Sequence, residues 1–212
     1  MRPMSAIPLF PLQSPLFPGG LLSLRIFEPR YLDLIQRCEK SGEPFGVVML
    51  TEGMEVRQRG AGEGFLTERF ERLGTLAHLE RVERPRPGLL QIRCLGGRRF
   101  RLGEPHCLPH GLWMGEAELL DEELALPVPE DLRTLAPLMQ RLLHTLETGA
   151  AAEDLPVQPP YRWDDCAWLA NRWCELLPLP LAEKQRLLAL DNPLLRLELI
   201  GDQLERLGAT RS

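Results

Sequence analysis

The sequence predicts an α+β fold in which strands come first along the chain and helices follow. Residues 1–122 carry short apolar runs separated by glycine and proline turn signals, which is typical of β-strands. Residues 123–212 instead carry leucines at helical spacing. Because the two patterns occupy separate halves, we expect a β-rich domain over residues 1–122 and a helical domain over residues 123–212.

The first half contains apolar segments that we predict to be strands, namely residues 7–12, 21–27, 45–50, 69–82, 89–95, 98–102 and 112–120. Residues 17–20 (FPGG) form a turn between the first two segments. Gly74 suggests a bulge inside the longest segment, and Gly96-Gly97 suggests a tight hairpin that needs positive φ. Residues 51–64 contain four glycines and many charges, which predicts a long exposed loop.

One helix is expected to interrupt these strands, beginning at Pro29, because proline is favoured at the first helical position. Its apolar face consists of Tyr31, Leu34, Ile35 and Cys38. Glu28 precedes the helix, where the helix dipole favours an acidic residue. We interpret this segment as a structural corner, in which Arg30 pairs with a carboxylate and Tyr31 packs.

The second half predicts four helices. One helical face comprises Leu132, Leu135, Met139, Leu142 and Leu146, and another comprises Cys166, Ala170, Trp173 and Leu177. A shorter helix is expected over residues 182–190, and residues 149–160 form a connection. Asn192 followed by Pro193 predicts a capped helix start. The helix that follows is expected to bury Leu197, Ile200, Leu204 and Leu207.

The net charge of the 212-residue chain is −5, from 25 basic and 30 acidic residues. Nucleic-acid-binding domains usually carry a basic surplus, so this total argues against that class. Residues 1–122 carry 16 basic and 16 acidic residues, so the acidic surplus lies wholly in residues 123–212. Within the first half, residues 81–101 hold seven arginines and one acidic residue, Glu83.

Targeting signals and disulfides are not expected. The chain has no run of about 18 apolar residues, and prolines interrupt its apolar N-terminus, so neither a membrane span nor a signal peptide is predicted. Five cysteines are an odd number, which favours reduced thiols in a cytoplasmic protein. Cys166 and Cys174 share a helical face and are expected to be small core residues.

The motifs of two catalytic mechanisms are missing, so we expect no enzyme activity and no cofactor. A phosphate-binding loop needs a lysine after glycine, but Lys40 and Lys184 each follow a glutamate. A Ser–Lys dyad needs a lysine whose pKa is lowered by burial. Lys184 lies on a polar helix turn, where we expect it to stay solvated and charged. A small-molecule hydrolase is a third hypothesis, which no arrangement of residues supports.

One cluster carries metal-ligand chemistry. It consists of His106, Cys107 and His110, and Cys94 is a further candidate from a neighbouring strand. Structural zinc usually takes four ligands from two closely spaced pairs, and only one such pair is evident here. Prolines flank the cluster, so we expect an ordinary loop and no metal.

Several motifs occur in the order found in the N-terminal domain of Lon proteases. They are residues 7–12 (IPLFPL), 16–20 (LFPGG), 24–31 (LRIFEPRY), 45–48 (FGVV), 74–77 (GTLA), 96–101 (GGRRFR), 177–180 (LPLP), 184–185 (KQ) and 191–193 (DNP). The chain resembles this family from about residue 7 to residue 208. The resemblance implies a PUA-like β pseudo-barrel with one inserted helix, followed by a C-terminal helical bundle.

The resemblance also implies a role in recognising unfolded or tagged polypeptides. Full Lon proteases add an ATPase module and a Ser–Lys protease module, and we expect this chain to be a stand-alone domain without them. It would then serve protein quality control or proteolysis together with a separate protease or chaperone. Candidate contacts for apolar peptide segments are Phe65, Leu66 and Trp113, which we expect to be exposed in a groove.

The alternative hypothesis is an RNA-binding module that uses the arginine-rich stretch 81–101. PUA-like folds can bind RNA, and arginine contacts phosphate well. The candidate contacts with RNA or another anion are Arg93, Arg98, Arg99 and Arg101. The competing interpretation is a charged hairpin face, which acids on neighbouring strands neutralise. The acids considered are Glu68, Glu71, Glu116 and Glu118.

Overall fold

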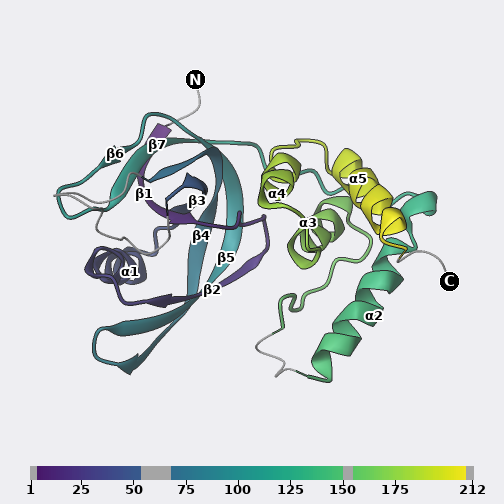
Figure 1. Cartoon of the computed structure of the whole chain (residues 1–212), viewed down its shortest axis with the longest axis horizontal. Helices are drawn as coiled ribbons and strands as arrows, with labels where there is room; N and C mark the ends of the chain where they lie inside the picture. The colour runs from purple at the N-terminus through teal and green to yellow at the C-terminus, as the bar shows by residue number, and fades with distance from the viewer. Residues whose placement is uncertain (1–3, 54–67, 150–154, 209–212) are drawn as a thin grey trace. The chain divides into compact units, whose positions relative to one another are not determined.

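The strands of the N-terminal unit, residues 1–122, pair into one mixed sheet that closes on itself (Figure 1). The computed structural model describes residues 4–53, 68–149 and 155–208. Its strands are β1 (Met4–Leu12), β2 (Leu21–Ile26), β3 (Phe45–Glu52), β4 (Arg69–Arg86), β5 (Leu89–Leu102), β6 (His106–Cys107) and β7 (Trp113–Leu119). Their order is β2-β5-β4-β3-β1-β7-β6, and an additional β5–β7 pairing closes five of them into a ring. The pseudo-barrel and the α+β class are therefore confirmed.

The interior of the ring is filled by a cluster to which all five ring strands contribute. The buried members are Leu9, Val48, Leu76, Phe100, Leu102 and Ala117, and Ile7, Phe70, Trp113 and Leu119 pack against them. Gly74 faces this cluster, because a Cβ on it would lie 2.7 Å from Phe100 Cζ and 2.3 Å from Val47 O. The position therefore requires glycine. The predicted irregularity is also present, since the pairing of β4 with β3 shifts register beside Gly74.

Helix α1 (Pro29–Ser41) covers the other face of the sheet (Figure 1). Its buried residues are Arg30, Tyr31, Leu34, Ile35 and Cys38, so the predicted apolar face is confirmed. The Tyr31 ring stacks on Phe10 of β1 with ring centroids 3.8 Å apart. Because β1 and β3 are covered on both sides, their sequences are nearly continuous apolar runs instead of alternating ones.

The predicted hairpin at Gly96-Gly97 is wrong, because β5 runs through both glycines without a break. The hairpin lies between β4 and β5 instead, and Gly88 in its turn has φ 77°. Gly96 is needed for close approach, since a Cβ there would lie 2.2 Å from Phe17 O. Backbone hydrogen bonds join Gly96 to the turn before β2, from Gly19 N at 2.7 Å and to Gly20 O at 2.8 Å.

The C-terminal unit, residues 123–212, is helical. It contains a short 3₁₀ turn, η1 (Glu130–Leu132), and the helices α2 (Leu135–Glu147), α3 (Cys166–Leu176), α4 (Leu181–Leu188) and α5 (Pro193–Arg206). Helix α3 contacts the three others. Asn192 caps α5 as predicted, with its side chain accepting from the backbone N–H of Leu194 and of Leu195. Leu207 was expected to be buried but is 60% exposed, because α5 ends at Arg206.

A buried ion pair joins the segments of this helical unit. Arg196 of α5 is fully buried, and its Nη1 lies 2.6 Å from Glu123 Oε1. The same guanidinium donates to Asn171 of α3 at 2.6 Å and to Leu187 O at 2.9 Å. The Asn171 side chain in turn donates to Glu123 Oε2 at 2.7 Å. The network therefore fixes α5 against α3 and against the start of the unit.

Two predicted connections include residues that the structure does not describe. Residues 54–64 of the predicted 51–64 loop and residues 150–154 of the predicted 149–160 connection are outside the described residues. Among the helices that the structure describes, none is both long enough and apolar enough to span a bilayer.

Candidate functional site

An arginine at the start of α1 is almost completely buried. Arg30 is 5% exposed and stacks over the Tyr31 ring at 4.4 Å. Its guanidinium donates to three oxygens: Glu28 Oε2 at 3.1 Å, Glu68 Oε1 at 3.2 Å and Gly111 O at 3.0 Å. Burial acts to lower the pKa of Arg30, but Tyr31 and the two carboxylates outweigh it and raise the pKa. The predicted corner, with Arg30 on a carboxylate and Tyr31 packed, is confirmed.

Glu68 connects this arginine to an aromatic pair. It is 6% exposed and precedes β4, and its second oxygen, Oε2, accepts a hydrogen bond from Trp113 Nε1. The Trp113 ring meets Phe70 edge to face, with centroids 5.3 Å apart and an interplanar angle of 83°. This is the favoured geometry of an aromatic pair. The polar atoms of Arg30, Glu68 and Trp113 are thus hydrogen-bonded within the protein. The half-buried rings of Phe70 and Trp113 remain partly accessible.

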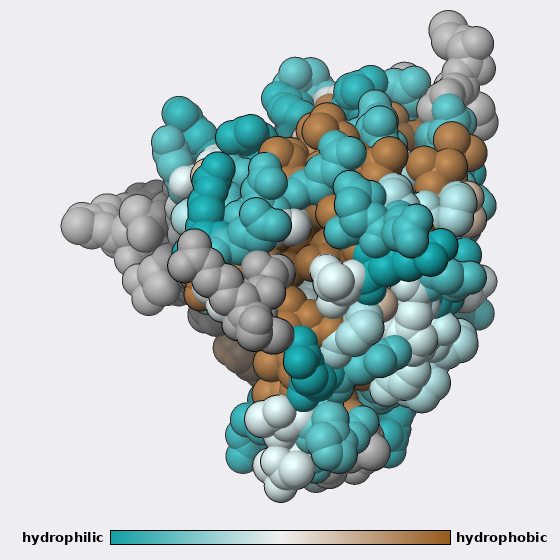
Figure 2. Space-filling view, turned by 90° about the vertical axis from the view of Figure 1, so that its right-hand side faces the viewer, coloured by the Kyte–Doolittle hydropathy of each residue, from teal (hydrophilic) through white to brown (hydrophobic). Residues whose placement is uncertain are grey.

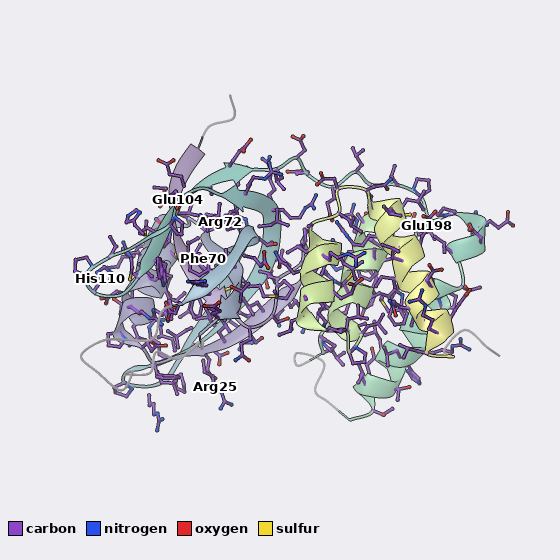
Figure 3. The ribbon with its side chains drawn as sticks, turned by 45° about the horizontal axis from the view of Figure 1, so that its top comes forward. Arg25, Phe70, Arg72, Glu104, His110 and Glu198 are labelled. Carbon is purple, nitrogen blue, oxygen red and sulfur yellow. The ribbon has the colours of Figure 1, made fainter. Side chains whose placement is uncertain are left out.

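The strands hold this arrangement in place. Phe70 lies on β4, opposite Leu50 of β3, and Trp113 begins β7, opposite Leu9 of β1. Farther along β4, the exposed Arg72 pairs with Glu104 at 3.2 Å (Figure 3). We call Arg30, Glu68, Phe70 and Trp113 the barrel-edge cluster. Its members come from three separate segments, which only the closed sheet brings together.

Of the predicted polypeptide contacts, Phe65 and Leu66 lie outside the described residues. Trp113 is half-buried and belongs to the barrel-edge cluster. Sequence reasoning did not select Phe70, although it begins the strand that was predicted from residue 69. The placement of Phe70 between the charged residues Arg69 and Glu71 was the one signal that pointed to an inward-facing ring there.

Ion pairs hold at least three of the seven arginines in the arginine-rich stretch: Arg81 with Glu83 at 2.6 Å, Arg93 with Glu80 at 3.4 Å, and Arg84 with Glu39. The predicted neutralisation is therefore present at these arginines, but the acidic partners lie on α1 and β4 and differ from the four acids that were expected. Glu80 precedes the stretch on β4, and Glu39 lies 45 residues before Arg84 on α1, so the composition of residues 81–101 alone does not identify these partners.

The remaining predicted anion contacts are dispersed. Arg98 donates from Nε and Nη2 to Leu120 O at 3.1 and 2.6 Å. Arg99 is 3% exposed, whereas Arg101 is exposed and lies opposite Glu118 in the β5–β7 register. The four arginines therefore do not present one common exposed face, and the RNA-binding alternative gains no support.

The candidate metal-binding residues differ in how exposed they are to solvent. Cys94 is fully buried in the core beneath α1, whereas His106 and Cys107 are exposed on β6 and His110 is exposed in the turn that follows. Within the described ranges, no group of three His, Cys, Asp or Glu residues has the arrangement of a metal site. Cys166 and Cys174 are fully buried, so their predicted role as core residues is confirmed.

The expectation for Lys184 needs correction. Burial lowers its pKa, although Cys174 and Glu175 partly oppose this effect. Its Nζ donates to Glu175 O at 3.1 Å instead of remaining in solvent. The polar neighbours of Lys184 in the sequence point elsewhere, because residues adjacent in a helix do not share a face.

The helical unit also exposes apolar side chains, which gather between polar residues on the face seen in Figure 2. The large exposed ones of this unit are Leu124, Leu146, Leu181, Leu195 and Leu207. Leu146 was assigned to the predicted helical face of 132–146, but it is 36% exposed in the last turn of α2. Exposed leucines are common on protein surfaces, and by themselves they do not define a site.

Comparison with known proteins decides the family. The model of the ATP-dependent protease La (LON) substrate-binding domain matches residues 6–206. The chain belongs to this family. A solved Lon N-terminal domain protein from Xanthomonas campestris is 30% identical, with a TM-score of 0.71 over 92% of this chain and 96% of that one. The N-terminal domain of the Mycobacterium avium complex Lon protease is 19% identical, with a TM-score of 0.57 over 93% and 97%. The search of curated proteins finds no match.

Membership of the Lon substrate-binding domain family supports a polypeptide-recognition role. The match extends across both units of the chain. The family is described as a substrate-binding domain. The arginines of residues 81–101 give no support to the competing hypothesis of RNA binding. Within the described residues, the barrel-edge cluster places partly accessible aromatic rings next to a fixed polar network.

Proposed function

We propose that this protein recognises polypeptides without catalysing a reaction on them, and that it holds apolar segments against Phe70 and Trp113. The observation that carries the proposal is the edge-to-face contact between these half-buried rings, at 5.3 Å, above the buried Arg30–Glu68 pair. Rings fixed in this way lose little conformational freedom when a ligand covers them, which favours binding.

The proposed biological setting is the handling of unfolded or tagged polypeptides in the cytoplasm, in cooperation with a separate protease or chaperone. The family's description as a substrate-binding domain of an ATP-dependent protease supports this setting. Apolar segments are exposed in unfolded chains and buried in folded ones, so an apolar recognition site distinguishes the two. We propose no cofactor and no nucleic-acid ligand.

The proposal is tested by fluorescence anisotropy with two labelled peptides of equal length. One contains an apolar run from an unfolded model protein, and the other has serines in its place. We expect Phe70→Ala to weaken binding of the apolar peptide by about 5- to 30-fold, because removal of a contacting ring costs about 1–2 kcal/mol. Phe70→Leu, which keeps the barrel packed, should lose less.

Phe27→Ala is the matched control, because Phe27 is 54% exposed and does not belong to the barrel-edge cluster. Its affinity for the apolar peptide should stay within twofold of the wild-type value. Equal losses in the two alanine variants, or a wild-type protein that does not distinguish the two peptides, would refute the proposed site.

A further inference from the structure

A pocket of about 390 Å³ lies between the exposed face of α1 and the turn that follows β6. It is lined by Asp33, Gln36, Arg37, Lys40 and His110. Gln36, Arg37 and Lys40 lie three, four and seven residues after Asp33. The four side chains therefore share one face of α1, opposite the buried face of the helix. All five side chains are exposed. This pocket is separate from the barrel-edge cluster, whose side chains do not line it.

The cationic groups of this pocket are available to a ligand. Among the described residues, neither Arg37 nor Lys40 has an ion-pair partner, whereas the neighbouring charges on α1 are used: Glu39 pairs with Arg84, and Arg30 pairs with Glu28. Of the described residues that line the pocket, Asp33 is the single acid. The charged side chains that line the pocket therefore carry a positive balance.

The wall formed by His110 is held by the same network that supports the aromatic pair. Gly111 O accepts from Arg30 Nη1 at 3.0 Å, and the turn is closed by hydrogen bonds from Leu108 N to Leu112 O and from Gly111 N to Leu108 O. His110 is three residues from Trp113, which limits their Cα separation to about 11 Å. An extended peptide of a few residues is therefore long enough to span the distance between these two residues.

We propose that this pocket binds acidic side chains of a polypeptide whose apolar segment lies at the barrel-edge cluster. The inference rests on the proposed function, because it assigns the substrate class of the same recognition surface. Charge complementarity selects this ligand: two unpaired cations and a histidine face solvent beside one carboxylate. Apolar segments flanked by glutamate or aspartate are thus the preferred substrates.

The test uses two labelled peptides with the same apolar run, one flanked by three glutamates and the other by three glutamines. In about 50 mM salt, the double variant Arg37→Ala with Lys40→Ala should bind the glutamate peptide about tenfold more weakly than wild type, since each exposed ion pair contributes a few-fold. Its affinity for the glutamine peptide should stay within twofold. Both substitutions are at exposed helical positions, and circular dichroism checks the fold.

The matched control is Arg25→Ala with Arg86→Ala, which removes two exposed arginines and changes the net charge equally. Figure 3 shows Arg25 and His110 at separate places on the N-terminal unit. If this control loses as much affinity as the pocket variant, or if wild type binds both peptides equally, the pocket assignment is overturned.

A second probe separates failure of this inference from failure of the proposed function. Hexaglutamate lacks apolar groups, and its binding is followed by NMR shifts of the His110 ring and the α1 amides. Shifts there that vanish in the pocket variant support the assignment even if the glutamine peptide does not bind and the apolar site is refuted. No shifts at millimolar hexaglutamate overturn it.

Discussion

Replacing Arg30 by methionine should destabilise the N-terminal unit far more than removal of an exposed arginine does. The Arg30 and Glu68 side chains are each 4% exposed, so the substitution leaves the Glu68 carboxylate buried without its cation. It also removes the donor to Gly111 O, which lies at 3.0 Å. Methionine keeps an apolar stem of similar length in contact with Tyr31, so the loss reports mainly the polar groups.

The expected cost of Arg30→Met is about 3–5 kcal/mol, the range for breaking a buried ion pair on one side. A domain of this size has a total stability of about 5–15 kcal/mol, so the variant remains measurable. The comparison is Arg84→Met, which breaks a pair with Glu39 whose side chains are 53% and 39% exposed. That substitution should cost less than about 1 kcal/mol.

The assay is urea denaturation followed by circular dichroism, with hydrogen exchange of the strand amides to assign the loss to the N-terminal unit. A third variant, Glu68→Gln, provides the thermodynamic cycle. In the Glu68→Gln background, Arg30→Met leaves a neutral amide buried instead of a charged carboxylate. The loss in unfolding free energy caused by Arg30→Met should therefore be smaller there by about 1.5 kcal/mol or more. The reasoning is refuted if Arg30→Met costs the same in both backgrounds, or no more than Arg84→Met.

Two further predictions concern the packed interiors. Gly74→Ala should destabilise the barrel by about 3 kcal/mol or prevent folding, because its Cβ would lie 2.3 Å from Val47 O. Gly88→Ala, with φ 77° but open space, should cost about 1 kcal/mol in the same denaturation experiment; equal costs would contradict this. Iodoacetamide at pH 8 should label the exposed Cys107 first. Burial raises the pKa of Cys94 and Cys174 to about 12, so mass spectrometry should find them modified only after unfolding, and rapid native labelling of either would refute the assignment.

The sequence was sufficient for those parts of the fold that depend on local patterns. Helix α1 was predicted from Pro29 and the spacing of its apolar face, and α5 from Asn192 and Pro193. These signals lie within one or two turns of the element they define, so no knowledge of the rest of the chain is needed. The error at Gly96 has the opposite origin: its glycine is required by Phe17, which is distant along the chain and close only after the strands pair.

The site was harder to predict for the same reason. Glu68 is 38 residues from Arg30 and 45 from Trp113, and no spacing rule connects residues at such separations. The motif at 28–31 did indicate a carboxylate partner for Arg30, but it did not identify Glu68. Trp113 was selected from the sequence as an exposed apolar residue. Its indole N–H instead donates a hydrogen bond to Glu68 inside the protein, so only part of its ring is accessible.

Under the proposed function, the barrel-edge cluster would let one surface accept many peptide sequences. Arg30, Glu68 and the Trp113 N–H satisfy one another, so they offer a ligand few hydrogen bonds that would demand a matching polar group. The aromatic faces that remain interact with any apolar side chain, in proportion to the area buried.

Selectivity among peptides must then come from charged residues around the rings. Arg37 and Lys40 supply such charges on α1, beside the turn that Arg30 anchors. A change at Arg30 should therefore weaken apolar and acidic recognition together, while changes at Arg37 and Lys40 should affect the acidic part alone.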